Sequence, residues 1–426
     1  MASAKPSQLA ARGPPWVKDN IESGSKKNNE IKKNEIKSAL PVQEEAESPE
    51  QKADEPLSDV QEGLAKIQRR KNVFFNPHMR FCRDLSSLWV GTLPPLPSVL
   101  DGFCASGARG LRYKLENSNV DHVTFLDAQP EAIQLAESNA RLNNIPEKQF
   151  RTMRADLNRL LGTGERFDLI EIDPFGTPVP YLAALMRCGS GMDERYVSVT
   201  ATDTAVLCGA HAAACYKVYA ARPLHSEVCH EAGLRILLAN MARAAASEDW
   251  ALEPQLCISH RHYFKVLARL RKGADGAVET AKTAMSYLVQ CKHCLYHEMH
   301  ASAADLRTEC PECGKRMEWG GPVWGGKWAE PKSIERMIRL LSQRPYIEVG
   351  ETGTVLKTIL DECEGPALYY DLHELSSRHK RVIPRAEDVV GKLREAGFFA
   401  ARTHFSSVAI RTDAGLEDVL AEMGKR

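Results

Sequence analysis

The stretch IEIDPFGTPVPYL, residues 170–182, places chemically capable residue types at the end of an apolar run. Asp173 is followed directly by Pro174 and Phe175. A carboxylate and a proline carbonyl accept hydrogen bonds, and an aromatic ring can stack on a flat unsaturated group. We therefore expect this stretch to hold a planar molecule that carries an amine. The alternative is a strand that ends in a proline turn around a buried phenylalanine.

The elements around this stretch predict an α/β fold. Short apolar runs alternate with helical stretches, and several of the runs end in an acidic residue. This alternation is typical of a parallel, Rossmann-like sheet that binds ligands at the carboxyl ends of its strands. A later stretch, residues 255–272, is expected to close the sheet. The predicted strands of the alternating part are SVLDGF, HVTFLDA, FRTMRAD, FDLIEIDPFG and RYVSVTATD.

The other strand ends predict a cofactor site. The loop CASGARG, residues 104–110, follows the first strand but lacks the GxGxxG pattern of pyrophosphate-bearing dinucleotides. S-adenosylmethionine, which has no pyrophosphate, fits better. Asp127 would bind the ribose hydroxyls, and Asp156 with the backbone at Leu157 would contact adenine. Each acid alone is better explained as a strand-end cap, but the set together favours a cofactor site.

Methyltransferases that act on exocyclic amines of bases place an acid or amide, two prolines and an aromatic residue after the fourth strand, and DPFG resembles this arrangement. The lone pair of such an amine is delocalised into the ring, so acceptors must orient the nitrogen toward the methyl group. Asp173 and the Pro174 carbonyl could be these acceptors. Stacking of the base on Phe175 would contribute roughly 1–3 kcal/mol, comparable with the few kcal/mol that base flipping costs.

Five segments together resemble the tRNA guanine-26 N2-dimethyltransferase family, especially its archaeal-type members. The resemblance runs in order from about Asn72 to Lys272, and the later segments fit as well. It implies the transfer of one or two methyl groups from S-adenosylmethionine to N2 of guanine 26 in tRNA. The segments are VFFNPHMRFCRDLS, DGFCASGARGLRY, IDPFGTPVPYL, SVTATDTAVLCG and HEAGLRILL.

The resemblance also implies roles for individual residues. Asp173 matches the catalytic acid, and Phe74 and Phe175 match two rings that flank the target base. Two features depart from the family pattern: Cys82 stands where asparagine is usual, and CASGARG replaces a loop closer to SATGIRG. The residues that match cofactor contacts are Arg83, Arg109, Asp127, Asp156 and Leu157.

Two CxxC pairs predict a metal site. Cys291 and Cys294 are separated by fifteen residues from Cys310 and Cys313. This spacing is typical of a four-thiolate zinc ribbon, in which the zinc is structural because no coordination position stays open. A redox role for either pair is the weaker alternative. The nearby histidines, His293, His297 and His300 in the same segment, are expected to be solvated loop residues rather than ligands.

The chain is expected to have three parts. Residues 1–70 are rich in polar and charged types and are predicted to be a disordered tail, in which residues 57–70 could form a helix. Residues 71–275 form the predicted S-adenosylmethionine-dependent methyltransferase domain. Residues 276–426 form a C-terminal domain with the four-cysteine zinc site and a helical, winged-helix-like module.

The composition constrains the expected cellular location of the protein and the kinds of partner that it binds. No apolar run approaches the roughly 20 residues of a membrane helix, and the N-terminus lacks a secretory signal. We therefore expect a cytoplasmic protein without a membrane partner, and nothing predicts an obligate protein partner. The 56 basic residues balance 56 acidic ones, so tRNA must bind at local basic patches, such as RHYFKVLARLRK and SSRHKRVIPR.

Two other functions stay open from the sequence. The protein could methylate another guanine, another exocyclic amine of RNA, or DNA. It could also be a nucleic-acid-binding scaffold that no longer reacts, although the joint presence of Asp127, Asp156 and Asp173 argues against that. The number of methyl groups transferred and any use of guanine 27 are not predicted.

Overall fold

The computed structural model describes residues 56–189 and 191–424, and residues Lys52–Arg426 form one compact unit. Most of the predicted tail, residues 1–55, lies outside the described residues. Within the described residues, no helix combines the length and apolar character that a membrane crossing needs.

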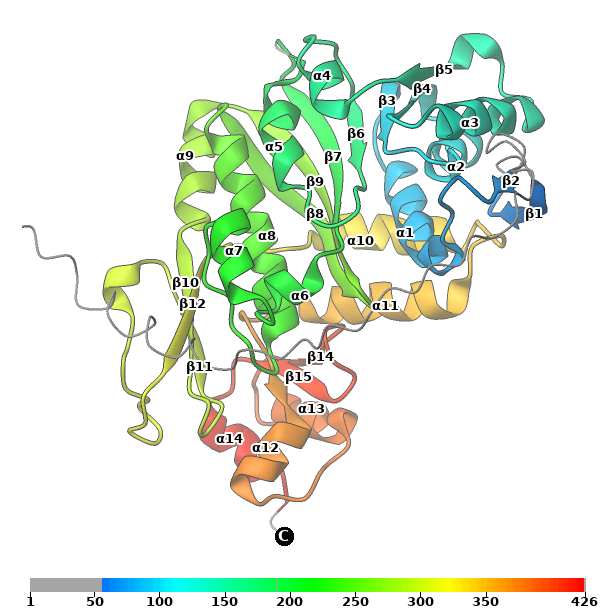
Figure 1. Cartoon of the computed structure of the whole chain (residues 1–426). Coiled ribbons are helices and arrows are strands. Elements are labelled where there is room, and N and C mark those ends of the chain that lie inside the picture. The colour runs from blue at the N-terminus through cyan, green and yellow to red at the C-terminus, as the bar shows by residue number, and fades with distance from the viewer. Residues whose placement is uncertain (1–55, 190, 425–426) are drawn as a thin grey trace, which may run out of the picture. The chain divides into compact units, whose positions relative to one another are not determined.

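A seven-stranded sheet lies at the centre of the unit, and its strand order is β5-β4-β3-β6-β7-β9-β8 (Figure 1). The pairs from β5 through β7 are parallel, whereas β9 runs antiparallel to both β7 and β8. This confirms the predicted Rossmann-like sheet. Its strands are β3 (Leu96–Gly102), β4 (Val120–Asp127), β5 (Phe150–Arg154), β6 (Leu169–Ile172), β7 (Glu194–Ala201), β8 (Trp250–His260) and β9 (Tyr263–Lys272).

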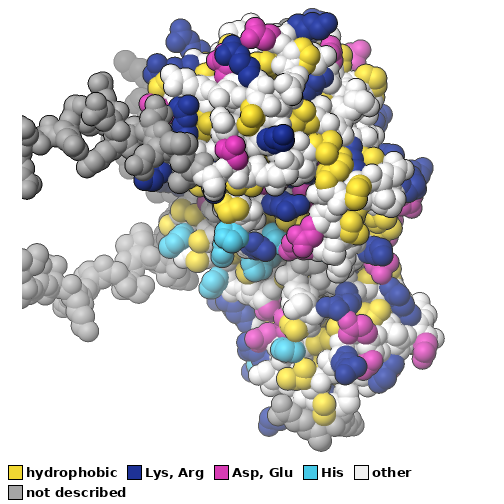
Figure 2. Space-filling view, turned by 90° about the vertical axis from the view of Figure 1, so that its right-hand side faces the viewer, with side chains coloured by type: hydrophobic (Ala, Val, Ile, Leu, Met, Phe, Trp, Pro, Cys, Tyr) yellow, Lys and Arg dark blue, Asp and Glu magenta, His cyan; other side chains and the backbone are white. Residues whose placement is uncertain are grey.

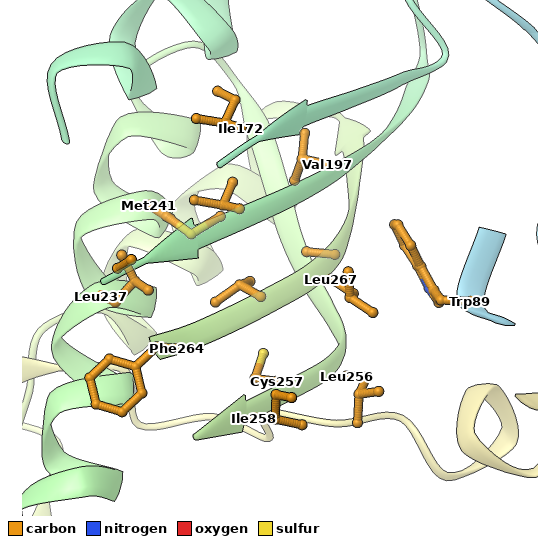
Figure 3. Close-up of a cluster of buried hydrophobic side chains, with 14 of the residues drawn as sticks. Trp89, Ile172, Val197, Leu237, Met241, Leu256, Cys257, Ile258, Phe264 and Leu267 are labelled. Atoms are coloured by element: carbon orange, nitrogen blue, oxygen red, sulfur yellow. The ribbon is translucent and has the colours of Figure 1, made fainter. Parts of the chain in front are cut away.

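Helices cover both faces of the sheet. Trp89 of α1 packs on one side of the central strands, and Leu237 and Met241 of α8 pack on the other (Figure 3). Both layers are needed because strands of a parallel sheet are apolar on both faces. The helices of this region are α1 (Arg80–Val90), α2 (Ala108–Glu116), α3 (Pro130–Leu142), α4 (Leu157–Leu161), α5 (Val179–Arg187), α6 (Thr204–Leu207), α7 (Ala212–Tyr219), α8 (Cys229–Ala246) and α9 (Ala274–Thr283), with 3-10 turns η2 (Pro77–Met79) and η3 (Glu147–Gln149).

The turn from β3 into α2 depends on two glycines. Gly107 precedes the helix with a φ of 77°, a conformation that favours glycine. A Cβ on Gly110 would lie 2.6 Å from Cε1 of Phe125 and 2.9 Å from Oδ2 of Asp101. These contacts bring the first turn of α2 close to β3 and β4. The cofactor loop predicted from CASGARG is therefore held tightly against the carboxyl ends of two strands.

The helix expected over residues 57–70 is wrong. These residues form a hairpin of β1 (Pro56–Glu62) and β2 (Ala65–Arg70), with Gly63 at a φ of 57° in the turn. The amide oxygens of Asn139 and Asn143, on α3 and just beyond it, accept hydrogen bonds from the backbone of β2 at 2.8 and 2.9 Å. The folded region therefore includes residues from Pro56, which the sequence assigned to the tail.

The C-terminal half contains two three-stranded sheets. In the first sheet, β10 (Ser286–Gln290) pairs with β11 (His297–His300) and β12 (Glu318–Val323). The second sheet has the order β13-β15-β14; it confirms the predicted two-stranded wing and adds β13 as a third strand. The other elements are η4 (Ala303–Asp305), α10 (Pro331–Leu341), α11 (Val349–Glu362), β13 (Tyr370–Asp371), α12 (Leu372–His379), α13 (Ala386–Glu395), β14 (Ala400–Arg402), β15 (Ala409–Thr412) and α14 (Leu416–Glu422).

A buried ion-pair cluster joins the wing to helix α8, which packs on the central sheet. Arg411 of β15 donates from Nη2 to Glu231 of α8 at 2.8 Å and from Nε to Glu362 of α11 at 3.0 Å. These side chains are fully buried, and Glu231 also pairs with Arg235 at 2.9 Å. Burial of charges is tolerated only when the charges are paired, so this cluster fixes how the C-terminal half docks.

Candidate active site

A cavity of about 790 Å³ opens at the carboxyl ends of β3, β4 and β6. Its walls combine the predicted reactive stretch with the predicted cofactor loop. The predicted site residues that line it are Phe74, Arg83, Arg109, Asp127, Asp173, Pro174 and Phe175. The sheet therefore brings together seven of the nine residues that the sequence proposed for the reaction and the cofactor.

Asp173 is held by Arg109, which lies on the first turn of α2. Nη2 of Arg109 donates to Oδ2 of Asp173, and Nη1 donates to Oγ of Ser86 at 3.1 Å. The guanidinium is buried, while the Asp173 side chain keeps 22% of its surface exposed to the cavity. One carboxylate oxygen is thus fixed from behind, which aims the group into the cavity.

The charge environment keeps Asp173 ionised. Burial raises its pKa, but the positive charges of Arg109 and Lys265 and a hydrogen bond from Arg109 outweigh burial, and the net pKa lies below the ordinary value. At neutral pH the group is therefore a hydrogen-bond acceptor only.

A buried network behind Asp173 supports this arrangement. Glu171, fully buried on β6, accepts from Lys265 Nζ at 2.5 Å and from the Tyr113 hydroxyl at 2.7 Å, and lies 3.4 Å from Arg109 Nε. Lys265 is 1% exposed. The basic stretch RHYFKVLARLRK was expected to offer nucleic-acid contacts, but Lys265 faces inward and donates to Glu171 and to Thr200 of the neighbouring strand β7.

Two aromatic rings stand at the mouth of the cavity. Phe74 and Phe175 are 55% and 77% exposed, which is unusual for phenylalanine. Their ring centroids lie 4.8 Å apart with the planes at 82°. The rings meet edge to face, and both retain open faces on which a planar group could stack.

The cofactor side of the cavity is built around Asp127. Its Oδ2 accepts from the backbone of Ala105 at 3.0 Å, and its Oδ1 accepts from the backbone of Gln129 at 2.9 Å. Each oxygen keeps further acceptor capacity for a hydroxyl. Asp101, which the sequence reasoning missed, also lines the cavity, and its Oδ2 accepts from Gly110 N at 2.9 Å. Burial raises the pKa of Asp101 to about 7.

Asp156 and Leu157 are not among the residues that line the cavity. Asp156 caps α4, because its Oδ1 accepts from the backbone of Arg159 at 3.0 Å, and the Leu157 side chain is 2% exposed in the core. In the segment after β7, Thr202 lines the cavity, whereas the carboxylate of Asp203 accepts from the Tyr219 hydroxyl at 2.8 Å.

Arg83 reaches the cavity but is bound to the N-terminal hairpin. Its Nε and Nη2 donate to the two carboxylate oxygens of Glu62, each at 2.6 Å, and Nη2 also donates to Asn76 O at 3.1 Å. Glu62 was not predicted as a site residue, since it lies in the predicted tail. The hairpin thus positions one wall of the cavity.

The four cysteines meet at one point. The sulfur atoms of Cys291 and Cys313 lie 3.5 Å apart, those of Cys294 and Cys310 lie 3.4 Å apart, and all four lie within 4.8 Å of one another. Tetrahedral zinc with bonds of about 2.3 Å separates its sulfur ligands by roughly 3.8 Å, so the cluster fits this ion. His293 is exposed as expected.

The expectation of solvated loop positions is wrong for His297 and His300. Both lie on strand β11 and are half-buried. His297 packs on the Tyr370 ring with centroids 4.4 Å apart, and His300 lies 2.8 Å from Glu298.

The region of this chain that matches known proteins includes the whole candidate site. Residues 50–424 match the profile of a family described as N2,N2-dimethylguanosine tRNA methyltransferase. The tRNA (guanine(26)-N(2))-dimethyltransferase of Methanothermobacter thermautotrophicus is 37% identical over 366 residues, which cover 84% of this chain and 95% of the relative. The tRNA (guanine(26)-N(2)/guanine(27)-N(2))-dimethyltransferase of Aquifex aeolicus is 34% identical over 383 residues, which cover 85% and 95%.

A solved structure agrees with these matches. Trm1 from Pyrococcus horikoshii, in complex with S-adenosyl-L-methionine, aligns with a TM-score of 0.80 at 33% identity. The alignment covers 87% of this chain and 100% of that chain. The matched range therefore includes both the cavity and the four cysteines.

Proposed function

Because the chain belongs to the N2,N2-dimethylguanosine tRNA methyltransferase family, we propose that it transfers one or two methyl groups from S-adenosylmethionine to N2 of guanine 26 in tRNA. The observation that carries this proposal is the single cavity in which Asp173, Pro174 and two exposed phenylalanines adjoin the Asp127 loop. An acceptor pair, stacking rings and a ribose-binding acid are what the reaction requires from the protein.

The residues around the β3 loop fit the cofactor. The Asp127 carboxylate is ordered by two backbone amides and can still accept from ribose hydroxyls. Arg83 and Arg109 carry positive charge to the cavity wall for the methionine carboxylate. Asp156 and Leu157 do not line the cavity, so no contact with adenine is assigned to them. When bound there, the cofactor supplies an electrophilic methyl group.

Asp173 and Pro174 would prepare the amine. The Asp173 carboxylate and the Pro174 carbonyl accept the hydrogens of guanine N2, which directs the nitrogen lone pair away from the ring plane. Methyl transfer would form the N–C bond as the bond from carbon to the sulfonium sulfur breaks, and the nitrogen would then carry a positive charge and strongly acidic N–H protons. The free oxygen of Asp173 can take that proton, even though its pKa is low: burial raises the pKa, but the charges of Arg109 and Lys265 outweigh burial.

Phe74 and Phe175 would hold the base. Guanine 26 has to leave its stack to reach Asp173, and flipping costs a few kcal/mol. Insertion of the base between the two rings would replace their edge-to-face contact by stacking of about 1–3 kcal/mol per base.

The four cysteines would hold structural zinc. Four thiolates leave no open position for substrate, and the turns around them are ordered by backbone bonds from Leu295 to Cys291 and from Gly314 to Cys310, at 2.8 and 2.9 Å. The ion would tie the β10–β12 sheet to the loops on both sides of it. We assign it no part in methyl transfer.

The tRNA surface would be assembled from local basic groups. Lys and Arg side chains are distributed among other types over the face seen in Figure 2 rather than gathered in one dominant patch. Arg261 lines the cavity, and the α12–α13 loop carries exposed Lys380 and Arg385. Phosphate contacts from such groups would set the register of tRNA, while the flipped base is read in the cavity. A cytoplasmic location follows as part of this proposal.

Residues 71–275 would act as the methyltransferase half and residues 276–426 as the C-terminal half. The two would work as one body, since Arg411 and Glu231 join them by a buried ion pair.

Product mapping tests the function. The purified protein is incubated with labelled S-adenosylmethionine and an unmodified tRNA transcript, and the nucleosides are located by mass spectrometry. We expect N2-methylguanosine or N2,N2-dimethylguanosine at position 26 and none in a transcript with adenine there. Methylation confined to another nucleotide, or no methylation of any competent tRNA, would contradict the proposal.

A further inference from the structure

Tyr263 lines the cavity at the start of β9, and its side chain is 3% exposed. Among the cavity-lining residues that the structure describes, it is the only one with a buried side-chain polar atom that has no hydrogen-bond partner. An unpaired buried hydroxyl costs about 1–3 kcal/mol, so a native protein retains one where something else completes it. We therefore expect the Tyr263 hydroxyl to form a hydrogen bond with a bound ligand.

Tyr263 lies on the same strand face as a residue of the buried network behind Asp173. Tyr263 and Lys265 are two residues apart on one strand and share a face, and Lys265 Nζ reaches Glu171 beside Arg109. Burial, first of all, raises the pKa of Tyr263 well above its ordinary value; the Cys82 thiol, by its charge and a hydrogen bond, and the charge of Asp173 raise it further, whereas Arg109 lowers it. The hydroxyl is thus a neutral donor in the cavity that Asp173 also lines.

The two arginines nearest Asp173 are already engaged. Arg109 is bound to Asp173 and Ser86, and Arg83 is bound to Glu62 and Asn76. Asp173 and the Pro174 carbonyl accept hydrogen bonds and can therefore satisfy only the N–H groups of guanine. The same edge of guanine also carries the acceptor O6, which needs a donor. Among the described residues that line the cavity, the Tyr263 hydroxyl is the buried side-chain donor without a geometric hydrogen-bond partner.

We propose that Tyr263 is a specificity-determining residue whose hydroxyl donates a hydrogen bond to O6 of the flipped guanine. This inference rests on the proposed function and adds to it the recognition of the base. Asp173 and Pro174 recognise the amine, and Tyr263 recognises the opposite end of the same edge. A site built around a polar contact rejects analogues that lack it, because its own buried group is then left unpaired.

The test pairs a protein change with a base change. Tyr263→Phe removes only the hydroxyl, and 6-thioguanine at position 26 keeps both N–H groups but replaces O6 by a weakly accepting sulfur. We expect the wild type to lose about five- to ten-fold in kcat/KM on the thio transcript. Tyr263→Phe should lose the same factor on guanine and show almost no further loss on 6-thioguanine.

Three controls separate this role from others. Tyr196→Phe removes a hydroxyl that donates to Glu194 outside the cavity, and it should keep the wild-type ratio between the two transcripts. Tyr263→Phe should keep a Tm close to that of the wild type, because the only described group that interacts with its hydroxyl is the Cys82 thiol, a weak acceptor. A lowered Tm with an unchanged ratio would assign Tyr263 a structural role and overturn the proposal.

Binding measurements make the test independent of turnover. The Kd values of both transcripts for the wild type and for Tyr263→Phe should show the same loss of discrimination. If no methylation occurs but Kd still depends on Tyr263 and O6 together, the reaction is wrong while the base contact stands. A Tyr263→Phe protein with the wild-type ratio, or one that only weakens S-adenosylmethionine binding, would overturn the inference.

Discussion

At the residue scale, the cavity separates groups that are fixed from groups that are free to act. Arg109, Glu171 and Lys265 are buried and committed to one another, and they hold Asp173 ionised. Phe74 and Phe175, in contrast, are exposed and contact each other only edge to face. The buried groups therefore set electrostatics and geometry, and the exposed rings are available to a ligand.

Phe175→Ala should weaken the use of tRNA without unfolding the protein. The ring is 77% exposed, so its removal leaves no internal cavity. The loss of stacking of about 1–3 kcal/mol predicts a fall in kcat/KM for tRNA of roughly five- to 150-fold. Steady-state kinetics with varied tRNA measures this, and Phe175→Tyr, which keeps a ring, is the control. An alanine variant with wild-type kcat/KM would exclude stacking on this ring.

At the element scale, the carboxyl ends of the strands position the acidic residues of the site, and the β1–β2 hairpin positions one of its arginines. The carboxyl ends of β3, β4 and β6 supply Asp101, Asp127 and Asp173. The β1–β2 hairpin contributes Glu62, which holds Arg83 through two hydrogen bonds of 2.6 Å. The sheet is thus sufficient to place the acids, and the hairpin is needed for one arginine.

The proposed zinc site leads to a prediction at this scale. Cys291→Ser should remove one zinc ion per chain and increase hydrogen exchange over residues 286–323, because the four-cysteine cluster joins the segment after β10 to the segment before β12. Elemental analysis and hydrogen exchange measure the two effects. Cys363→Ser alters a buried thiol outside the cluster and should retain the metal. A wild-type protein that is fully folded and free of metal would rule out the site.

The sheet and most of the site were predictable because their signals are local. Strand periodicity and strand-end acids marked Asp127 and Asp173, and the CxxC spacing marked the four cysteines. The hairpin was not predictable, because the residues that anchor its second strand, Asn139 and Asn143, lie about 75 positions later in the chain. Tyr263 was missed for a related reason: nothing in its own segment shows that its hydroxyl is unpaired.

At the scale of the whole molecule, the two halves depend on a few buried charges. Glu231, Glu362 and Arg411 come from α8, α11 and β15 and are fully buried. Arg344, on the chain between α10 and α11, also donates to Asn117 at 2.7 Å beside α2. Because such contacts are far apart in sequence, they make the described unit cooperative.

The interface should weaken in acid. Burial raises the pKa of Glu231, but Arg411 and Arg235 outweigh it and lower the pKa to about 2 from an ordinary 4.5. A depressed pKa contributes stability that is fully present above about pH 4.5 and is lost as pH falls toward 2, here about 3 kcal/mol. Urea unfolding at a series of pH values measures this.

Substitution isolates the contribution of Glu231. Glu231→Gln should lower stability at pH 7 and flatten the pH dependence between pH 4.5 and 2. The matched control is Glu364→Gln, which breaks a pair with Lys327 of 2.6 Å at the surface and should change stability by no more than about 1 kcal/mol. Equal effects of the two variants would show that the buried cluster does not carry the interface.

The most direct test of the account separates binding from reaction at Asp173. Asp173→Asn keeps the size of the side chain but removes its negative charge and offers one acceptor oxygen instead of two. Single-turnover methylation of a tRNA transcript, with S-adenosylmethionine binding measured by calorimetry, follows the two functions separately. We predict a loss of methylation rate of at least about 100-fold with S-adenosylmethionine affinity within a few-fold of wild type. Near-normal methylation, or a loss of cofactor affinity as large as the loss of rate, would contradict the role of Asp173 in orienting guanine N2.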